Sequence, residues 1–129
     1  MSDILGLIGR LLFGGLFFYN GVNHFLNRGS MTGYAAYKGL PLPGASIIVS
    51  GVWLVIAGLS VILGFRPEIG LVMIAIFLAG VTPVMHNYWA APDPNTRLAD
   101  TINFHKNMAL LGAALLLLLL PRPWPYSIG

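Results

Sequence analysis

The sequence predicts an all-α integral membrane protein: a four-helix up-down-up-down bundle that forms a single transmembrane domain over residues 1–129. Three observations predict it. Four apolar stretches of about twenty residues each match a hydrocarbon core of about 30 Å. Hydrophobic residues make up 57% of the chain and charged residues only 9%, against about 25% charged in a soluble domain. Because 129 residues cannot bury four apolar helices in one another, lipid must cover them.

The first span is expected at residues 4–25. Asp3 is the only charged residue before it, and no basic region precedes it. The segment is therefore predicted to be a transmembrane helix and not a cleaved signal peptide. The net charge of +3 is spread over the loops, which favours contact with the lipid bilayer and gives no indication of nucleic-acid binding.

The remaining spans are expected at residues 45–65, 69–89 and 101–120. A tight turn at 64–68 links the second and third spans, since glycine ends helices and Pro67 can begin one. Thr96 or Asp100 could cap the fourth helix. The long first loop has room for a short interfacial helix at 31–38, where Tyr34 and Lys38 are residue types that settle at lipid headgroups.

Small and basic residues indicate how the spans pack and where they meet water. Close helix approach requires small residues, and the candidates are Gly14, Gly15, Gly21, Gly51, Gly58 and Gly80. Arg10, near the start of the first span, could extend its side chain to the membrane interface on the side where that span begins. Arg122, Trp124 and Tyr126 form a cluster typical of an interfacial anchor.

All three histidines are predicted to lie at one face of the membrane. Because successive spans alternate in direction, the end of the first span meets the start of the second, the end of the third and the start of the fourth. His24, His86 and His105 occupy these positions, and we call this side of the bundle the histidine face.

Polar stripes on three spans end at the histidine face. Residues 20, 23, 24 and 27 recur at helical spacing, Thr82 precedes His86 by four positions, and Thr101 precedes His105 by four. Since polar groups at membrane depth are costly unless they face the bundle interior or a wet cavity, we expect a polar pocket. Its candidate cofactor-binding residues are Asn20, Asn23, His24, His86, Trp89, His105, Lys106 and Asn107.

Each candidate also has a purely structural interpretation. His24 could hydrogen-bond Asn20 or a neighbouring carbonyl. Trp89 could belong to an aromatic belt, and Lys106 could contact headgroups with its extended side chain. The stripes leave both interpretations open.

The chemistry open to such a pocket is narrow. With no cysteine, the chain cannot form a disulfide, a Cys-ligated metal site or a thiol relay, and no metal site or catalytic residue is predicted. No covalently bound cofactor is expected. Imidazole and amide groups can, however, bind the carbonyl oxygens of a quinone, and histidine can carry a proton near neutral pH.

The ordered set of motifs resembles the DoxX family of small four-helix bacterial membrane proteins. The segments that carry the resemblance are Arg10, residues 14–17 and 20–25, Tyr34 with 39–41, Ser50 with Gly51, His86 with Trp89, and residues 104–107. It covers essentially the whole chain.

The resemblance implies a multi-pass protein of the bacterial inner membrane that is linked to redox chemistry. The family's founding association is with the small membrane subunit of a thiosulfate:quinone oxidoreductase, so quinone and a redox-protein partner subunit are the implied partners. Most members have no established activity. Whether the chain is an enzyme therefore stays open. A structural or assembly subunit without catalysis, a homo-oligomer and a small transporter are the alternatives.

Overall fold

Five α-helices and one short 3-10 helix form the structure, a computed structural model that describes residues 2–128. They are α1 (Ser2–Leu26), α2 (Arg28–Tyr37), α3 (Pro43–Leu63), α4 (Pro67–Met85), η1 (Tyr88–Ala90) and α5 (Pro94–Leu118). In this part of the chain, four helices are long and apolar enough to cross a membrane. The all-α membrane bundle predicted from the sequence is therefore confirmed.

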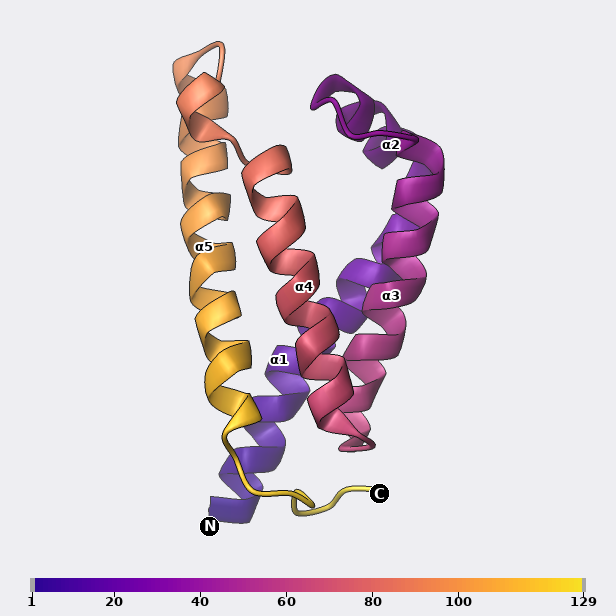
Figure 1. The fold of residues 1–129 in the computed structure, drawn as a ribbon, viewed down its shortest axis with the longest axis vertical. Helices are drawn as coiled ribbons and strands as arrows, with labels where there is room; N and C mark the ends of the chain where they lie inside the picture. Colours follow the sequence, from indigo (N-terminus) through magenta and orange to yellow (C-terminus); the bar gives the residue numbers. More distant parts are fainter. Residues whose placement is uncertain (1, 129) are drawn as a thin grey trace.

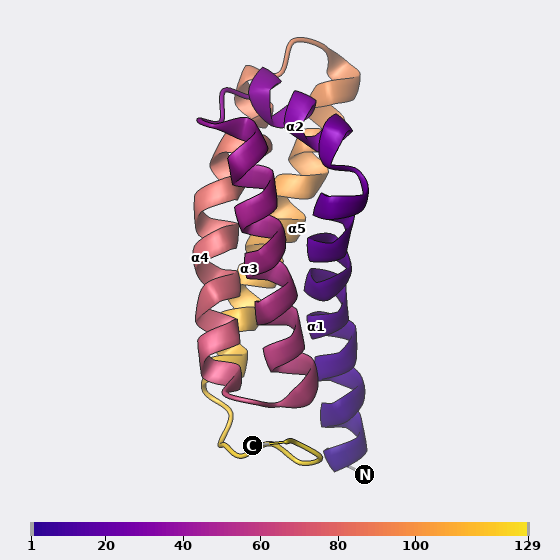
Figure 2. The same cartoon turned by 90° about the vertical axis from the view of Figure 1, so that its right-hand side faces the viewer.

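The four long helices alternate in direction, and each packs against the next. α1 lies against α3, α3 against α4, and α4 against α5, as Figures 1 and 2 show. Their shared core is apolar; its largest fully buried side chains are Phe17, Leu54, Leu71, Ile74 and Leu78. The outward faces are apolar too: Leu12 is 72% exposed and Leu116 68%. A surface of this kind is stable only in contact with lipid.

Glycine brings α1 and α3 into close contact. A Cβ added to Gly58 would lie 2.6 Å from the backbone nitrogen of Phe18, and one added to Gly21 would lie 2.8 Å from the carbonyl oxygen of Gly51. Gly14 faces the same contact. These four glycines confirm the predicted seams. Gly15 and Gly80 were wrongly included, because nothing lies within 4 Å of either.

The helix boundaries at the histidine face differ from those expected. α4 ends at Met85 and not at residue 89; the next residue, His86, has non-helical backbone angles, with φ −124° and ψ 47°. α5 begins at Pro94, seven positions before the predicted start at 101. Its N-cap is Asp93, whose carboxylate accepts from the Thr96 amide at 2.7 Å. Neither Thr96 nor Asp100 caps the helix. The predicted interfacial helix is present as α2.

The C-terminal segment folds back under the opposite end of the bundle, where residues near both termini lie (Figure 2). Arg10 is 5% exposed, and its guanidinium donates to the carbonyl oxygens of Ile62, Pro125 and Tyr126. Trp124 is buried in the core, which corrects its assignment as an interfacial anchor.

Candidate functional site

A cavity of about 560 Å³ lies beneath α2, between the α1–α3 pair and the α4–α5 pair. Its volume falls in the range of small-molecule sites. The lining is apolar toward the bundle centre, with Phe17, Leu54 and Leu78. Val49 and Trp53 of α3 and Val81 of α4 line the side where these two helices diverge toward α2 (Figure 1). The polar lining residues are Asn20, Asn23, His24, Tyr34, Ser46, Ser50, His86, Asn103, Lys106 and Asn107.

The polar stripe of α1 contributes His24, which is 7% exposed. Its Nδ1 lies 2.6 Å from the backbone oxygen of Asn20, one turn earlier. The alternative interpretation from the sequence, a hydrogen bond to Asn20, is therefore correct for one ring nitrogen. The other nitrogen, Nε2, makes no hydrogen bond within residues 2–128. The amide of Asn23 accepts from Asn27 and faces the Met31 sulfur at 3.9 Å.

The stripe of α5 contributes Asn107 and Lys106. Asn107 is 9% exposed, and its amide nitrogen donates to the Thr82 hydroxyl at 3.2 Å, which ties α5 to α4. The Lys106 ammonium donates to Asn103 at 3.3 Å and has no acidic partner in the described part of the chain. It is thus a free positive charge on the cavity wall.

A buried ion pair lies at the histidine face, next to the cavity-lining residues Tyr34 and His86. The Lys38 ammonium, at the end of α2, lies 2.7 Å from Asp100 Oδ2 in α5 and 2.8 Å from Asn87 Oδ1. The Lys38 and Asp100 side chains are only 5% and 3% exposed. Tyr34 donates to the other Asp100 oxygen at 3.5 Å, and His86 Nδ1 lies 3.6 Å from that oxygen. Three parts of the chain therefore meet at one carboxylate: α2 with its C-cap, the residue that follows α4, and α5 itself.

Burial and neighbouring charges shift the pKa values of two residues in this cluster, Tyr34 and Lys38. Burial raises the pKa of the Tyr34 hydroxyl, and the Asp100 charge raises it further. Burial alone would lower the pKa of Lys38, but the hydrogen bond and charge of Asp100, together with Tyr34, outweigh it, so the pKa of Lys38 lies above its ordinary value. Both groups keep their protons at neutral pH, Lys38 as a cation.

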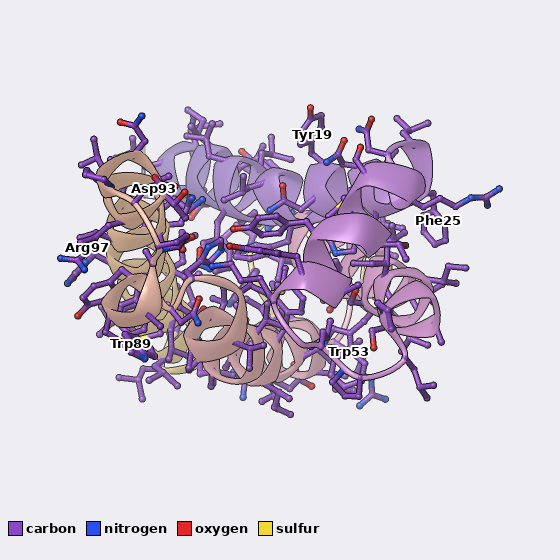
Figure 3. All side chains as sticks on the ribbon, turned by 90° about the horizontal axis from the view of Figure 1, so that it is seen from above. Tyr19, Phe25, Trp53, Trp89, Asp93 and Arg97 are labelled. Atoms are coloured by element: carbon purple, nitrogen blue, oxygen red, sulfur yellow. The ribbon has the colours of Figure 1, made fainter. Side chains whose placement is uncertain are left out.

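Six of the eight predicted site residues line the cavity: Asn20, Asn23, His24, His86, Lys106 and Asn107. His105 and Trp89 do not, so the expected convergence of three imidazoles is wrong for one of them. The exposed His105 bonds the Thr101 carbonyl at 2.8 Å and packs on Tyr88 and Phe104. Figure 3 shows Trp89, a residue of η1, at the edge of the bundle and away from its centre.

The sequence interpretation missed Asp100 and Lys38. Lys38 was assigned to the headgroup region and Asp100 to a loop or cap. The sequence holds a signal that would have placed Asp100 correctly: Asp93 before Pro94, with Thr96 three positions after the aspartate, is a helix start. A helix that begins there places Asp100 nearly two turns inside α5, where its carboxylate needs a partner.

The fold and the cavity define a class of protein: a small multi-pass membrane bundle with a polar-ended cavity at one face. The family DoxX matches residues 5–87, which extend from α1 to the cavity histidine that follows α4. The chain is also 30% identical over 118 residues to "Inner membrane protein YphA" of Escherichia coli (strain K12), a match that covers 88% of this chain and 81% of that protein. No solved structure matches.

The chain belongs to the DoxX family, as its sequence motifs predicted. With four membrane-spanning helices and an inner-membrane relative, it is a multi-pass protein of the bacterial inner membrane.

Proposed function

We propose that the protein binds the headgroup of a quinone in its cavity and acts as a redox-associated component of the inner membrane. One observation carries the proposal: the cavity is apolar toward the bundle centre and ends at imidazole, amide and ammonium groups. A quinone has the matching chemistry, with an apolar tail and two carbonyl oxygens that accept hydrogen bonds.

The way into the cavity supports a lipid-soluble ligand. Val49 is 63% exposed, so the lining continues to the lipid-facing surface of α3. A ligand dissolved in the bilayer can therefore reach the cavity from the side of the bundle.

The test is to titrate decylubiquinone into the protein in lipid nanodiscs. Quinones quench indole fluorescence on contact, and Trp53 lines the cavity. We expect saturable quenching that Lys106→Ala or Asn20→Ala weakens by about tenfold, since each variant removes a lining residue that can donate a hydrogen bond to a quinone carbonyl oxygen. Trp89→Phe serves as the matched control because Trp89 lies outside the cavity. Quenching that does not saturate, in protein that also carries no endogenous quinone, would refute the proposal.

A second candidate function is an anchoring or assembly subunit of a redox-protein complex. It is favoured by exposed aromatic side chains at the histidine face, with Tyr37 66% and Trp89 57% exposed. Purification from native membranes in a gentle detergent should then yield a stoichiometric partner subunit. A product that contains this chain alone, as a monomer or a homo-oligomer, would contradict this function and leave the quinone proposal standing.

A further inference from the structure

The two histidines of the cavity share a feature that decides which redox form of a quinone they suit. In each ring, Nδ1 is the nitrogen that faces a protein oxygen. We infer that the cavity binds the reduced form, a hydroquinone, more tightly than the oxidised quinone. This inference rests on the proposed function and specifies the substrate class of that same site.

His24 provides the first part of the argument. Its Nδ1 lies 2.6 Å from the backbone oxygen of Asn20. A carbonyl oxygen can only accept a hydrogen bond, so Nδ1 must carry the hydrogen. In the neutral ring, Nε2 is then a bare acceptor. His24 lines the cavity, and Nε2 is its only ring nitrogen without a partner.

In His86, a neighbouring carboxylate favours the same tautomer, with the hydrogen on Nδ1. Its Nδ1 is buried and has no hydrogen bond, and the oxygen it faces is Asp100 Oδ1 at 3.6 Å. That distance is too long for a hydrogen bond, but the negative charge favours a hydrogen on Nδ1. Lys38 holds the carboxylate in place from its other oxygen. The Nε2 atom of His86 is therefore also left as an acceptor on a residue that lines the cavity.

Asn107 adds a third acceptor. Its amide nitrogen donates to the Thr82 hydroxyl, and its amide oxygen has no partner in the described chain. The cavity lining also holds donors, which are the Lys106 ammonium and the amide nitrogens of Asn20, Asn23 and Asn103. The acceptors thus include both imidazoles, whose hydrogen positions are set by the protein and not by the ligand.

The two forms of the ligand differ in what they offer these acceptors. A hydroquinone carries two hydroxyl groups that can donate to Nε2, whereas a quinone offers only carbonyl oxygens. A bound quinone would leave at least one imidazole acceptor unpaired, which costs about as much as a lost hydrogen bond. We expect the hydroquinone to bind about tenfold more tightly. For a two-electron couple, that ratio raises the midpoint potential of the bound pair by about 30 mV.

The test compares decylubiquinol with decylubiquinone, under anaerobic conditions, in nanodiscs at a pH of about 8, where an ordinary imidazole is neutral. Calorimetry gives both dissociation constants. Tighter binding of the quinol supports the inference. Equal affinities, or tighter binding of the quinone, would overturn it and leave the proposed function intact. Failure of both ligands to bind would overturn the proposed function and, with it, this inference.

Variants then assign the selectivity to the imidazoles. His24→Phe and His86→Phe keep a ring but remove the acceptor, so each should bring the two affinities closer by about fivefold. His105→Phe is the matched control: its Nδ1 makes the same bond to the carbonyl four residues earlier, at 2.8 Å, but the ring lies outside the cavity. Selectivity that persists in folded His24→Phe and His86→Phe proteins would contradict the inference.

Asp100→Asn tests the hydrogen position itself. An asparagine amide can donate to Nδ1 of His86 and move the ring hydrogen to Nε2, which turns the acceptor into a donor. The selectivity for the quinol should then fall while binding of the quinone improves. If quinone binding does not improve in folded Asp100→Asn protein, His86 does not act through its tautomer and this part of the inference is wrong.

Discussion

The ion pair between Lys38 and Asp100 should be among the largest single contributions to the stability of this bundle. The 2.7 Å contact joins α2 to α5, and both side chains are almost fully shielded. Removing one partner of a buried pair costs about 3–5 kcal/mol, because the other charge stays behind without compensation.

The two partners should not be equivalent. Lys38→Met leaves Asp100 nearly two turns inside α5, with only Tyr34 and His86 nearby, at 3.5 and 3.6 Å. We expect the full cost of about 3–5 kcal/mol. Asp100→Ala leaves Lys38 on a flexible stem at the end of α2, still bonded to Asn87 at 2.8 Å. That variant should lose less, about 2 kcal/mol.

Reversible unfolding by sodium dodecyl sulfate in mixed micelles, followed by circular dichroism, measures both free energies of unfolding. The double variant Lys38→Met/Asp100→Ala removes both charges, so it should cost less than the sum of the two single variants by about 2 kcal/mol. If the losses are additive, or if each single variant costs less than about 1 kcal/mol, the side chains are solvated in the membrane and the reasoning fails.

Three further predictions follow from other contacts. Gly58→Ala should destabilise the bundle by about 1–3 kcal/mol because its Cβ would lie 2.6 Å from the Phe18 nitrogen, whereas Gly80→Ala, which meets nothing, should be neutral or slightly stabilising in the same assay. Arg10→Ala should cost about 2–4 kcal/mol and speed amide hydrogen exchange at residues 126–128, while Arg97→Ala, with no side-chain partner in the described chain, should do neither. Asp93→Ala should lower the thermal midpoint at neutral pH. The Thr96 amide and hydroxyl lower the pKa of Asp93, so its contribution is present above the ordinary value of 3.8 and is lost as the pH falls through the folded-state pKa; a difference between the proteins that persists well below that pKa would contradict this.

The spans and the topology could be predicted from the sequence because both follow from one-dimensional properties. Hydrophobic length locates the spans, and alternation of direction places three histidines at one face. The helical spacing of Asn20, Asn23 and His24 correctly put them on the cavity side of α1. These features need only periodicity and the thickness of a bilayer.

The rest of the site depends on rotation and on long-range partners. A helical wheel for α5 does not say which of Lys106 and His105 faces inward, because the stripe has polar residues at adjacent positions. Arg10 and Lys38 were predicted to reach the interfaces since that is what isolated cations do. Their partners, Tyr126 and Asp100, lie 116 and 62 positions away, and only the folded chain brings them together.

The attachment of Arg10 has a consequence for how the protein is made. Arg10 belongs to the first helix, but two of the three carbonyl groups that accept its hydrogen bonds belong to Pro125 and Tyr126, which lie 115 and 116 positions later in the chain and are synthesised after it. Until those residues are synthesised, the Arg10 guanidinium in the nascent first helix lacks two of its hydrogen-bond acceptors. The end of the bundle around Arg10 can therefore reach its final structure only after residues 125 and 126 have been synthesised.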